Sequence, residues 1–185
     1  MLSYVFWHWP RAGVDSTLYE STQREFHTAL TAAPPPGFLG STCHAIVGAP
    51  WAGGGGPAYE DWYLQENSAA LDELNTAAVN AARRVPHDDL AGMAAGGTAG
   101  LYQLELGGHL PSATTALWFG KPANWSYGRM TDAMRPLLEA TGASLWMRRM
   151  VLGPTPEFCL RTHGPVSLPP ELTVLSIPLS LVWPA

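Results

Sequence analysis

The order of its strand-like and helix-like segments restricts the fold of this sequence most strongly. Strands are predicted at residues 3–9, 38–47, 59–64 and 100–106, and helices at residues 15–33 and 68–80, with a short extra helix at 86–90. The order β-α-β-β-α-β is typical of a ferredoxin-like unit. The first 110 residues are therefore predicted to form one such unit.

Local signals support the first strand and the helix that follows it. Residues 3–9 are large and mostly apolar at neighbouring positions, which favours a strand covered on both faces. Asp15 is a good N-cap, and Val14 and Tyr19 occupy the two positions of a hydrophobic staple. Residues 34–37, three prolines and a glycine, end the predicted helix.

The same order begins again in the second part of the chain. A strand is predicted at 115–121, a helix at 127–141, strands near 142–153 and 157–160, a short helix at 170–176 and a last strand at 179–183. Residues 142–153 align without a gap on residues 37–48, with glycines at both ends. We therefore expect an α+β protein of two ferredoxin-like repeats, 1–110 and a shorter 111–185, in one compact unit. Their sheets would pack face to face as a pseudo-dimeric α/β barrel.

Charge and cysteine content exclude several classes of protein. The chain has 10 Lys and Arg against 15 Asp and Glu, a net charge of −5, and no basic run longer than a pair. Binding to nucleic acid or to an anionic membrane surface needs a concentrated basic surface, so neither partner is expected. Cys43 and Cys159 lie in apolar runs without metal-ligand spacing, which predicts two buried free thiols. No stretch reaches 18 apolar residues and no secretory leader is apparent, so we expect a cytoplasmic protein.

Tryptophan is the most informative single residue type in this chain. Eight tryptophans are present, and six of them fall on predicted strands: Trp7, Trp9, Trp62, Trp118, Trp146 and Trp183. Such aromatic side chains either fill packed layers or line a pocket for an apolar ligand. The hypothesis of a pocket assigns Trp7, Trp9, Trp62 and Trp118 to its walls.

A few isolated polar residues on the strands are candidates for chemistry. His8 and His44 lie among apolar neighbours, so each is either a general base or a buried neutral imidazole. Arg148 and Arg149 point to opposite faces of a strand, so one of them points inward.

An inward arginine needs a carboxylate or an anionic ligand. Asp61 and Glu105 are the candidate carboxylates, and Arg149 is the candidate ligand-binding residue because it aligns with His44. Asp61 and Tyr102 are further candidates for ligand binding, with paired or backbone-bonded side chains as the alternative.

Several motifs that look functional do not predict a cofactor site. His87, Asp88 and Asp89 are consecutive, and three successive residues cannot easily converge on one metal ion, so no metal is predicted. The four glycines at 53–56 lack the Lys-Ser/Thr ending of a phosphate loop and are interpreted as a loop that flaps over a pocket mouth. No Gly-x-Ser-x-Gly elbow is present, which disfavours an α/β-hydrolase.

Three patches of the sequence resemble the dimeric α/β-barrel superfamily, to which EthD-like, NIPSNAP-like and antibiotic-monooxygenase-like proteins belong. They are the strand Tyr4–Trp9, the helix segment Glu25–His27 and the segment Tyr59–Leu64. In that superfamily two ferredoxin-like units usually pair between chains. The resemblance implies a pocket between sheet and helices. The superfamily includes cofactor-free monooxygenases, isomerases, heme enzymes and proteins without known activity.

Three hypotheses of function follow. The first is a protein that binds a small apolar or aromatic molecule, or a cofactor-free monooxygenase- or isomerase-like enzyme, in which His8 or His44 handles a proton. The second is a non-catalytic structural or interaction protein whose aromatic residues are core. The third is a heme-dependent enzyme with a histidine ligand. A fused pair of units is expected to be a monomer or a homodimer.

Overall fold

The computed structural model describes residues 1–184, which contain eight β-strands and four α-helices. The first part of the chain forms β1 (Leu2–Pro10), α1 (Ser16–Ala32), β2 (Phe38–Ile46), β3 (Ala58–Gln65), α2 (Ala70–Ala78), α3 (Arg84–Met93) and β4 (Ala94–Leu106). Short 3₁₀ turns, η1 (Gly53–Gly55) and η2 (Ala81–Arg83), precede β3 and α3. The second part forms β5 (Thr115–Phe119), α4 (Tyr127–Thr141), β6 (Ser144–Arg148), β7 (Phe158–Thr162) and β8 (Val174–Trp183).

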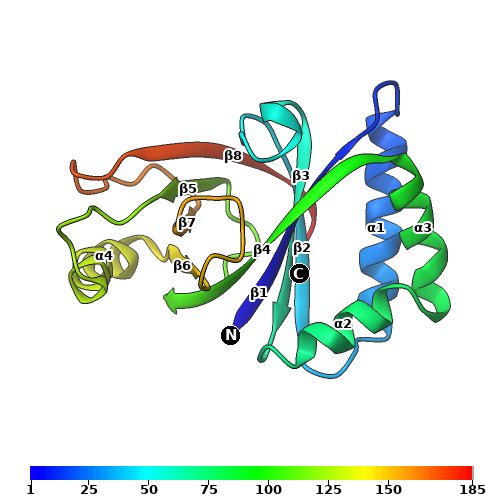
Figure 1. Cartoon of the computed structure of the whole chain (residues 1–185), viewed down its shortest axis with the longest axis horizontal. Coiled ribbons are helices and arrows are strands. Elements are labelled where there is room, and N and C mark those ends of the chain that lie inside the picture. The colour runs from blue at the N-terminus through cyan, green and yellow to red at the C-terminus, as the bar shows by residue number, and fades with distance from the viewer. Residues whose placement is uncertain (185) are drawn as a thin grey trace.

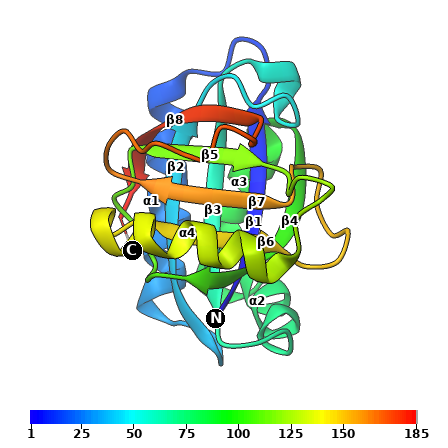
Figure 2. The same ribbon diagram turned by 90° about the vertical axis from the view of Figure 1, so that its left-hand side faces the viewer.

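All eight strands join in one closed antiparallel barrel with the order β1-β3-β2-β8-β5-β7-β6-β4. The first four strands are neighbours in the order β4-β1-β3-β2, and the last four in the order β8-β5-β7-β6. Helices α1, α2 and α3 lie at one end of the molecule, and α4 lies at the other (Figure 1). Figure 2 shows α4 in front of the strands of the second half, running roughly along them. The α+β class predicted from the sequence is confirmed.

Capping residues mark the ends of α1 and α4. The Asp15 side chain accepts a hydrogen bond from the backbone nitrogen of Leu18 at 2.9 Å, which confirms Asp15 as the N-cap of α1. Ser126 caps α4 in the same way, and Gly142 ends that helix with a left-handed φ of 67°. Pro136 lies inside α4, in its second half.

The predicted helix at residues 170–176 is wrong. Residues from Val174 onward belong to β8, where Val174, Leu175 and Ser176 pair with residues of β5. The backbone hydrogen bonds of a closing barrel outweigh the weak local helix preference of this short segment. Leu172 and neighbouring apolar residues of the preceding connection pack on the same apolar cluster as α4, where a second helix was expected.

Several predicted strands have different lengths in the structure, and the largest differences are at β4 and β6. β4 begins at Ala94 instead of residue 100, because the small residues 94–99 pair with β1 despite their low strand preference. The strand predicted near 142–153 is limited to β6, since Met150 takes a positive φ of 53° that ends the extended backbone.

The barrel interior is a closed aromatic core. Trp7, Trp62, Trp118 and Trp146 are all fully buried there. The ring centroids of Trp62 and Trp146 lie 4.9 Å apart, and those of Trp7 and Trp118 lie 5.7 Å apart, in edge-to-face arrangements. Both cysteines are free and buried, as predicted. Among residues 1–184, none of the helices has the length and apolarity to cross a membrane.

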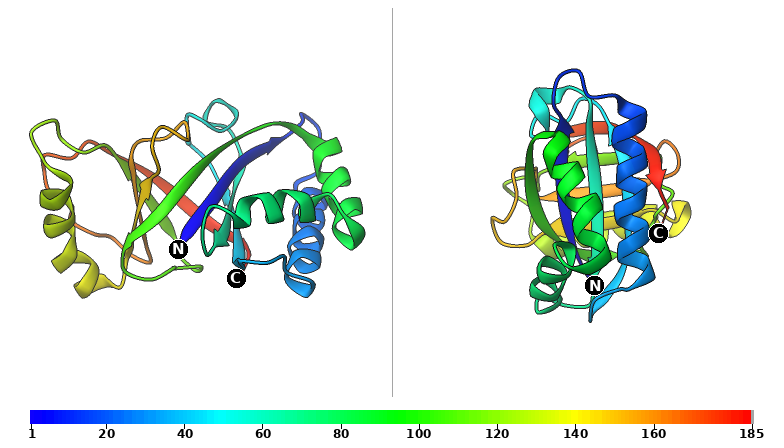
Figure 3. Two further views of the ribbon diagram at one scale, coloured as in Figure 1. Left: turned by 60° about the horizontal axis from the view of Figure 1, so that its bottom comes forward. Right: turned by 90° about the vertical axis from the view of Figure 1, so that its right-hand side faces the viewer.

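The outer face of the first four strands is covered by α1 and α3, which run side by side over it (Figure 3). Tyr19 of α1 packs with Cys43 and Tyr59, and Phe26 and Leu30 of α1 pack with Tyr63. The strands of this half are therefore covered on both faces, which explains why their sequences are apolar at successive positions.

Candidate functional site

A cavity of about 660 Å³ lies between the outer face of the first four strands and helices α1, α2 and α3. Most of its wall is apolar, and its polar groups come from a few side chains. It is lined by Tyr4, Phe6, His8, Tyr19, Gln23, Phe26, Asp61, Tyr63, Leu71, Asp72, Leu74, Asn75, Ala78, His87, Leu90, Ala91, Ala94, Ala95, Gly96 and Gly97. This position, between sheet and helices, is where the resemblance places a pocket.

Strand alternation decides which residues reach the cavity. On β1, Tyr4, Phe6 and His8 face the helices, whereas Val5 and Trp7 point into the barrel. On β3, Asp61 and Tyr63 line the cavity from the strand next to β1. Gly97 of β4 pairs with His8, so the position beside the imidazole has no side chain.

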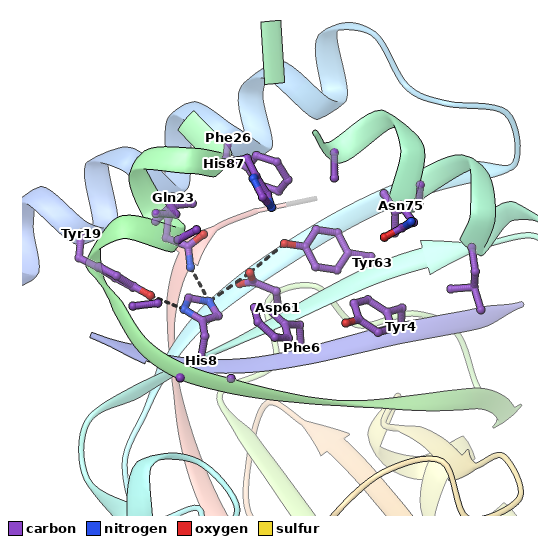
Figure 4. Close-up of a pocket in the computed structure, with 18 of the residues that line it drawn as sticks. Tyr4, Phe6, His8, Tyr19, Gln23, Phe26, Asp61, Tyr63, Asn75 and His87 are labelled. Atoms are coloured by element: carbon purple, nitrogen blue, oxygen red, sulfur yellow. Dashed lines mark hydrogen bonds and ion pairs between the residues drawn. The ribbon is translucent and has the colours of Figure 1, made fainter. Parts of the chain in front are cut away.

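A hydrogen-bond network surrounds His8 at one end of the cavity (Figure 4). Its Nδ1 lies 2.6 Å from the Tyr19 hydroxyl, and its Nε2 lies 3.2 Å from Asp61 Oδ2. The Gln23 amide nitrogen lies 2.6 Å from the same Nε2. The imidazole is held between the rings of Phe6 and Tyr59, whose centroids are 5.3 Å and 5.6 Å from it.

These distances give each nitrogen of the His8 imidazole a defined set of partners. With the proton on Nδ1, His8 donates to the Tyr19 oxygen, and Nε2 accepts a hydrogen bond from the Gln23 amide. When Nε2 gains a proton, it has Asp61 Oδ2 within reach as an acceptor. Gln23 therefore occupies the position that a proton-donating ligand atom would take.

Asp61 is an ionised carboxylate in a buried position, with only 2% of its surface exposed. Burial alone would raise its pKa, but the positive charge that His8 and His27 carry when protonated and the hydrogen bonds of both imidazoles outweigh burial and hold the pKa well below its ordinary value. Tyr63 donates a hydrogen bond to Oδ2 at 2.9 Å, and His27 Nε2 lies 3.6 Å from Oδ1. The carboxylate is thus available to stabilise an imidazolium at His8.

Tyrosine hydroxyls around the carboxylate remain donors. Burial, followed by the negative charge of Asp61, raises the pKa of Tyr19 and raises the pKa of Tyr63 well above its usual value. Both hydroxyls are therefore protonated at neutral pH. Tyr19 fixes the orientation of His8, and Tyr63 fixes the orientation of Asp61.

His27, Cys43 and Asp61 bring potential metal-ligand atoms within 4.8 Å of one another. Burial raises the pKa of the Cys43 thiol well above its usual value, and Asp61 adds to this effect. Metal binding requires a thiolate, so this environment opposes it. His27 also has a hydroxyl partner, since its Nδ1 lies 2.7 Å from Ser41 Oγ. We therefore interpret the cluster as the buried support of Asp61.

Only two of the residues predicted from the sequence meet in this cavity, His8 and Asp61. Trp7, Trp62, Trp118, Tyr102 and His44 point into the barrel interior, and Trp9 packs partly buried against the same core. The expected tryptophan wall is therefore replaced by Tyr4, Phe6, Phe26 and Tyr63. The tryptophans point inward because theirs are the largest side chains and they fill the barrel interior, whereas the outer face of these strands is covered by helices.

His44 belongs to a buried ion-pair cluster inside the barrel. Arg161 Nη2 lies 3.3 Å from His44 Nδ1, and Arg161 Nη1 lies 3.5 Å from Glu60 Oε1. The indole nitrogens of Trp7 and Trp62 donate to the two Glu60 oxygens at 2.8 Å and 2.6 Å. Burial and the Arg161 charge lower the pKa of His44 to about 3. The imidazole is therefore a neutral partner of Arg161.

The inward arginine is Arg161 on β7, and its carboxylate is Glu60, instead of the predicted Asp61 or Glu105. Arg149 is half-buried in the connection after β6, where its backbone nitrogen donates to Leu101. Arg148, which is also half-buried, bonds the backbone oxygen of Gly153. Arg161 lies two residues after Cys159 on β7, so both side chains are on the face of the strand that points into the barrel core.

Sequence reasoning also missed Tyr19, Gln23 and His27. These residues share the buried face of α1 with Phe26 and Leu30. The available signal was their spacing, since positions 19, 23, 26, 27 and 30 form one helical stripe. Polar side chains on a stripe that faces a sheet need partners, and here those partners are His8, Ser41 and Asp61.

Comparison with known proteins identifies the fold. No family model and no curated protein matches the sequence. A candidate monooxygenase from Lactobacillus acidophilus NCFM has a TM-score of 0.59 at 8% identity, covering 98% of this chain and 94% of that one. An anthrone oxidase-like protein has a TM-score of 0.49 at 9% identity, covering 96% and 90%. Chlorite dismutase from Candidatus Nitrospira defluvii, in complex with imidazole, has a TM-score of 0.48 at 9% identity, covering 98% and 92%.

The first of these similarities shows that the chain has the α/β-barrel fold implied by the resemblance of its sequence. Identity of this order establishes fold alone. The function has to be argued from the residues of the cavity.

Proposed function

We propose that the protein is a small-molecule enzyme in which His8 takes a proton from a ligand bound between the sheet and α1, α2 and α3. The observation that carries the proposal is an imidazole that contacts an ionised, buried carboxylate at the wall of a cavity of about 660 Å³. Ligand cavities in proteins are usually apolar with a few convergent polar groups and have volumes of about 300–1,000 Å³. The cavity described here has both properties.

Each residue of the network has a defined part in this reaction. A ligand atom that carries an acidic proton replaces the Gln23 amide at His8 Nε2 and gives up its proton there. Asp61 then stabilises the imidazolium across a contact of 3.2 Å, while Tyr19 keeps the ring in one orientation. The aromatic walls formed by Tyr4 and Phe6 exclude water from the transfer.

Proton removal of this kind begins the reactions of isomerases and of cofactor-free monooxygenases, which are the two reaction classes we propose. The strand order in each half supports a fused pair of ferredoxin-like repeats, 1–110 and 111–185, because β4-β1-β3-β2 and β8-β5-β7-β6 are equivalent orders. We expect such a fused pair to act as a monomer or a homodimer. Two free, buried thiols agree with a cytoplasmic location.

Heme does not fit this cavity. A heme-ligating histidine needs a free ring nitrogen directed at the iron, but Tyr19 lies at His8 Nδ1, and the Asp61 carboxylate lies 3.2 Å from Nε2. The heme propionates also need cationic partners, and no Lys or Arg lines the cavity.

A non-catalytic role predicts a filled interior, and the barrel interior is indeed filled by tryptophans. The cavity lies outside the barrel, however, and a purely structural role leaves its polar network unexplained.

A ligand screen on paired variants tests the proposal. Thermal shift of the wild type against apolar aromatic compounds identifies a ligand, because a hundredfold excess over the dissociation constant stabilises the native state by about 2.7 kcal/mol. His8→Gln and His44→Gln are then compared for turnover of that ligand. The proposal predicts loss of turnover only in His8→Gln. Unchanged turnover in His8→Gln would refute it.

A further inference from the structure

A buried acceptor atom without a donor lies beside His8. Gln23 Oε1 is buried without a hydrogen-bond partner, and Gln23 lines the cavity. In Figure 4 the Gln23 amide nitrogen faces His8 and its oxygen is turned away from the imidazole. A buried acceptor that lacks a donor destabilises the protein, so this atom favours a ligand that brings a donor.

Two donors beside His8 are already in use. Tyr63 donates to Asp61, and the Gln23 amide donates to His8. An anionic ligand group is bound best by charged donors. No Lys or Arg lines the cavity to supply them.

The charged residues that line the cavity also favour a ligand that brings donors. Asp61 lies next to His8, Asp72 lies exposed at the N-terminal end of α2, and no Lys or Arg contributes to the wall. The pKa of Asp61 lies below its usual value, so its charge persists at neutral pH. Aromatic faces of Tyr4, Phe6 and Tyr63 complete the wall, and such faces attract cations.

We propose that this cavity selects a ligand with a protonated amino group and a flat apolar body, and that it rejects carboxylates and phosphates of the same size. The amino group donates to Gln23 Oε1 and Asp61, and the apolar body lies along Tyr4 and Phe6. The inference rests on the proposed function, because it places the amino group beside the imidazole of His8.

Three probes with one carbon skeleton test the selection: phenethylamine, phenethyl alcohol and hydrocinnamate, which are cationic, neutral and anionic. Calorimetry on the full chain should show phenethylamine binding at least about tenfold more tightly than hydrocinnamate, a difference of about 1.4 kcal/mol. Asp72→Lys, at an exposed position that does not belong to the core, should reduce this ratio severalfold. Asp132→Lys makes the same charge change on α4, at the opposite end of the molecule, and should leave the ratio unchanged.

Each outcome decides the inference. Equal or tighter binding of hydrocinnamate overturns it, as does a failure of all three probes to bind at millimolar concentration. An equal effect of Asp72→Lys and Asp132→Lys also overturns it, because the selection would then come from net charge.

A different result would refute the proposed function while leaving the inferred ligand class intact. If phenethylamine binds selectively but His8→Gln leaves the turnover of a ligand intact, the ligand class stands and the general base does not.

Discussion

Replacing Asp61 by Asn removes the charge on which the site depends while keeping the size of the side chain. The carboxylate accepts from Tyr63 at 2.9 Å, pairs with His8 at 3.2 Å and lies 3.6 Å from His27. An amide keeps one acceptor oxygen, but it turns an NH₂ group toward at least one of these donors. The variant therefore leaves buried polar groups without partners.

The size of the expected stability loss follows from the burial of the Asp61 carboxylate. Breaking a buried charged pair by removing one partner costs about 3–5 kcal/mol. In a domain of this size each kcal/mol lowers Tm by roughly 2–4 °C, so Asp61→Asn should lower Tm by about 10 °C at neutral pH. A depressed folded-state pKa means that the Asp61 contribution is complete above the unfolded pKa of about 3.9 and is lost as pH falls toward the folded value. The difference between variant and wild type should therefore shrink in strong acid.

Urea unfolding followed by tryptophan fluorescence measures this loss at neutral pH and at about pH 2.5, below the ordinary aspartate pKa. Asp132→Asn on α4 is the matched control, and it should change stability by less than about 0.5 kcal/mol. A loss below about 1 kcal/mol for Asp61→Asn, or a loss that does not depend on pH, would refute the reasoning that Asp61 is a buried, ionised centre of the network.

Three further predictions concern other parts of the molecule. Gly97→Ala places a Cβ 2.5 Å from Phe6 Cζ, so it should push that ring into the cavity and weaken phenethylamine binding at least about fivefold by calorimetry, roughly 1 kcal/mol. Arg161→Met should destabilise the protein by about 3–5 kcal/mol in urea, and adding Glu60→Gln should recover part of that loss, because the unpaired buried charge is then gone. Because the pKa of His44 is lowered to about 3, its ring should remain neutral in NMR titrations at mildly acidic pH, and stability should fall as pH drops below about 6.5, where the unfolded chain binds the proton. If the stability losses of Arg161→Met and Glu60→Gln simply added up, the prediction for the buried ion pair would be contradicted. Titration of the His44 ring near neutral pH would contradict the prediction for His44.

The sequence predicted the order of elements well because that order depends on local signals. β1 begins and ends within one residue of the predicted range, and Asp15 caps α1 as expected. The segment 170–176 was mistaken for a helix because its strand conformation depends on pairing with β5, which is distant in sequence. Long-range pairing of this kind leaves no local trace.

The site was harder to predict than the fold because both faces of the strands are apolar. His8 and Trp7 are neighbours, yet only His8 faces the helices, and alternation cannot assign the faces when tryptophan fills one and tyrosine the other. Asp61 could be named as a polar residue on a strand, whereas its partners on α1, Tyr19 and Gln23, become visible only when the helix is placed on the sheet.

The most direct test of the account is an NMR titration of the histidine ring signals with phenethylamine, assigned through His8→Gln and His44→Gln. The account predicts that the His8 signals shift on binding, because His8 lines the cavity, while the His44 signals remain in place inside the closed barrel. Saturable binding that moves the His44 signals and leaves those of His8 unchanged would contradict it, and would place the ligand site inside the barrel.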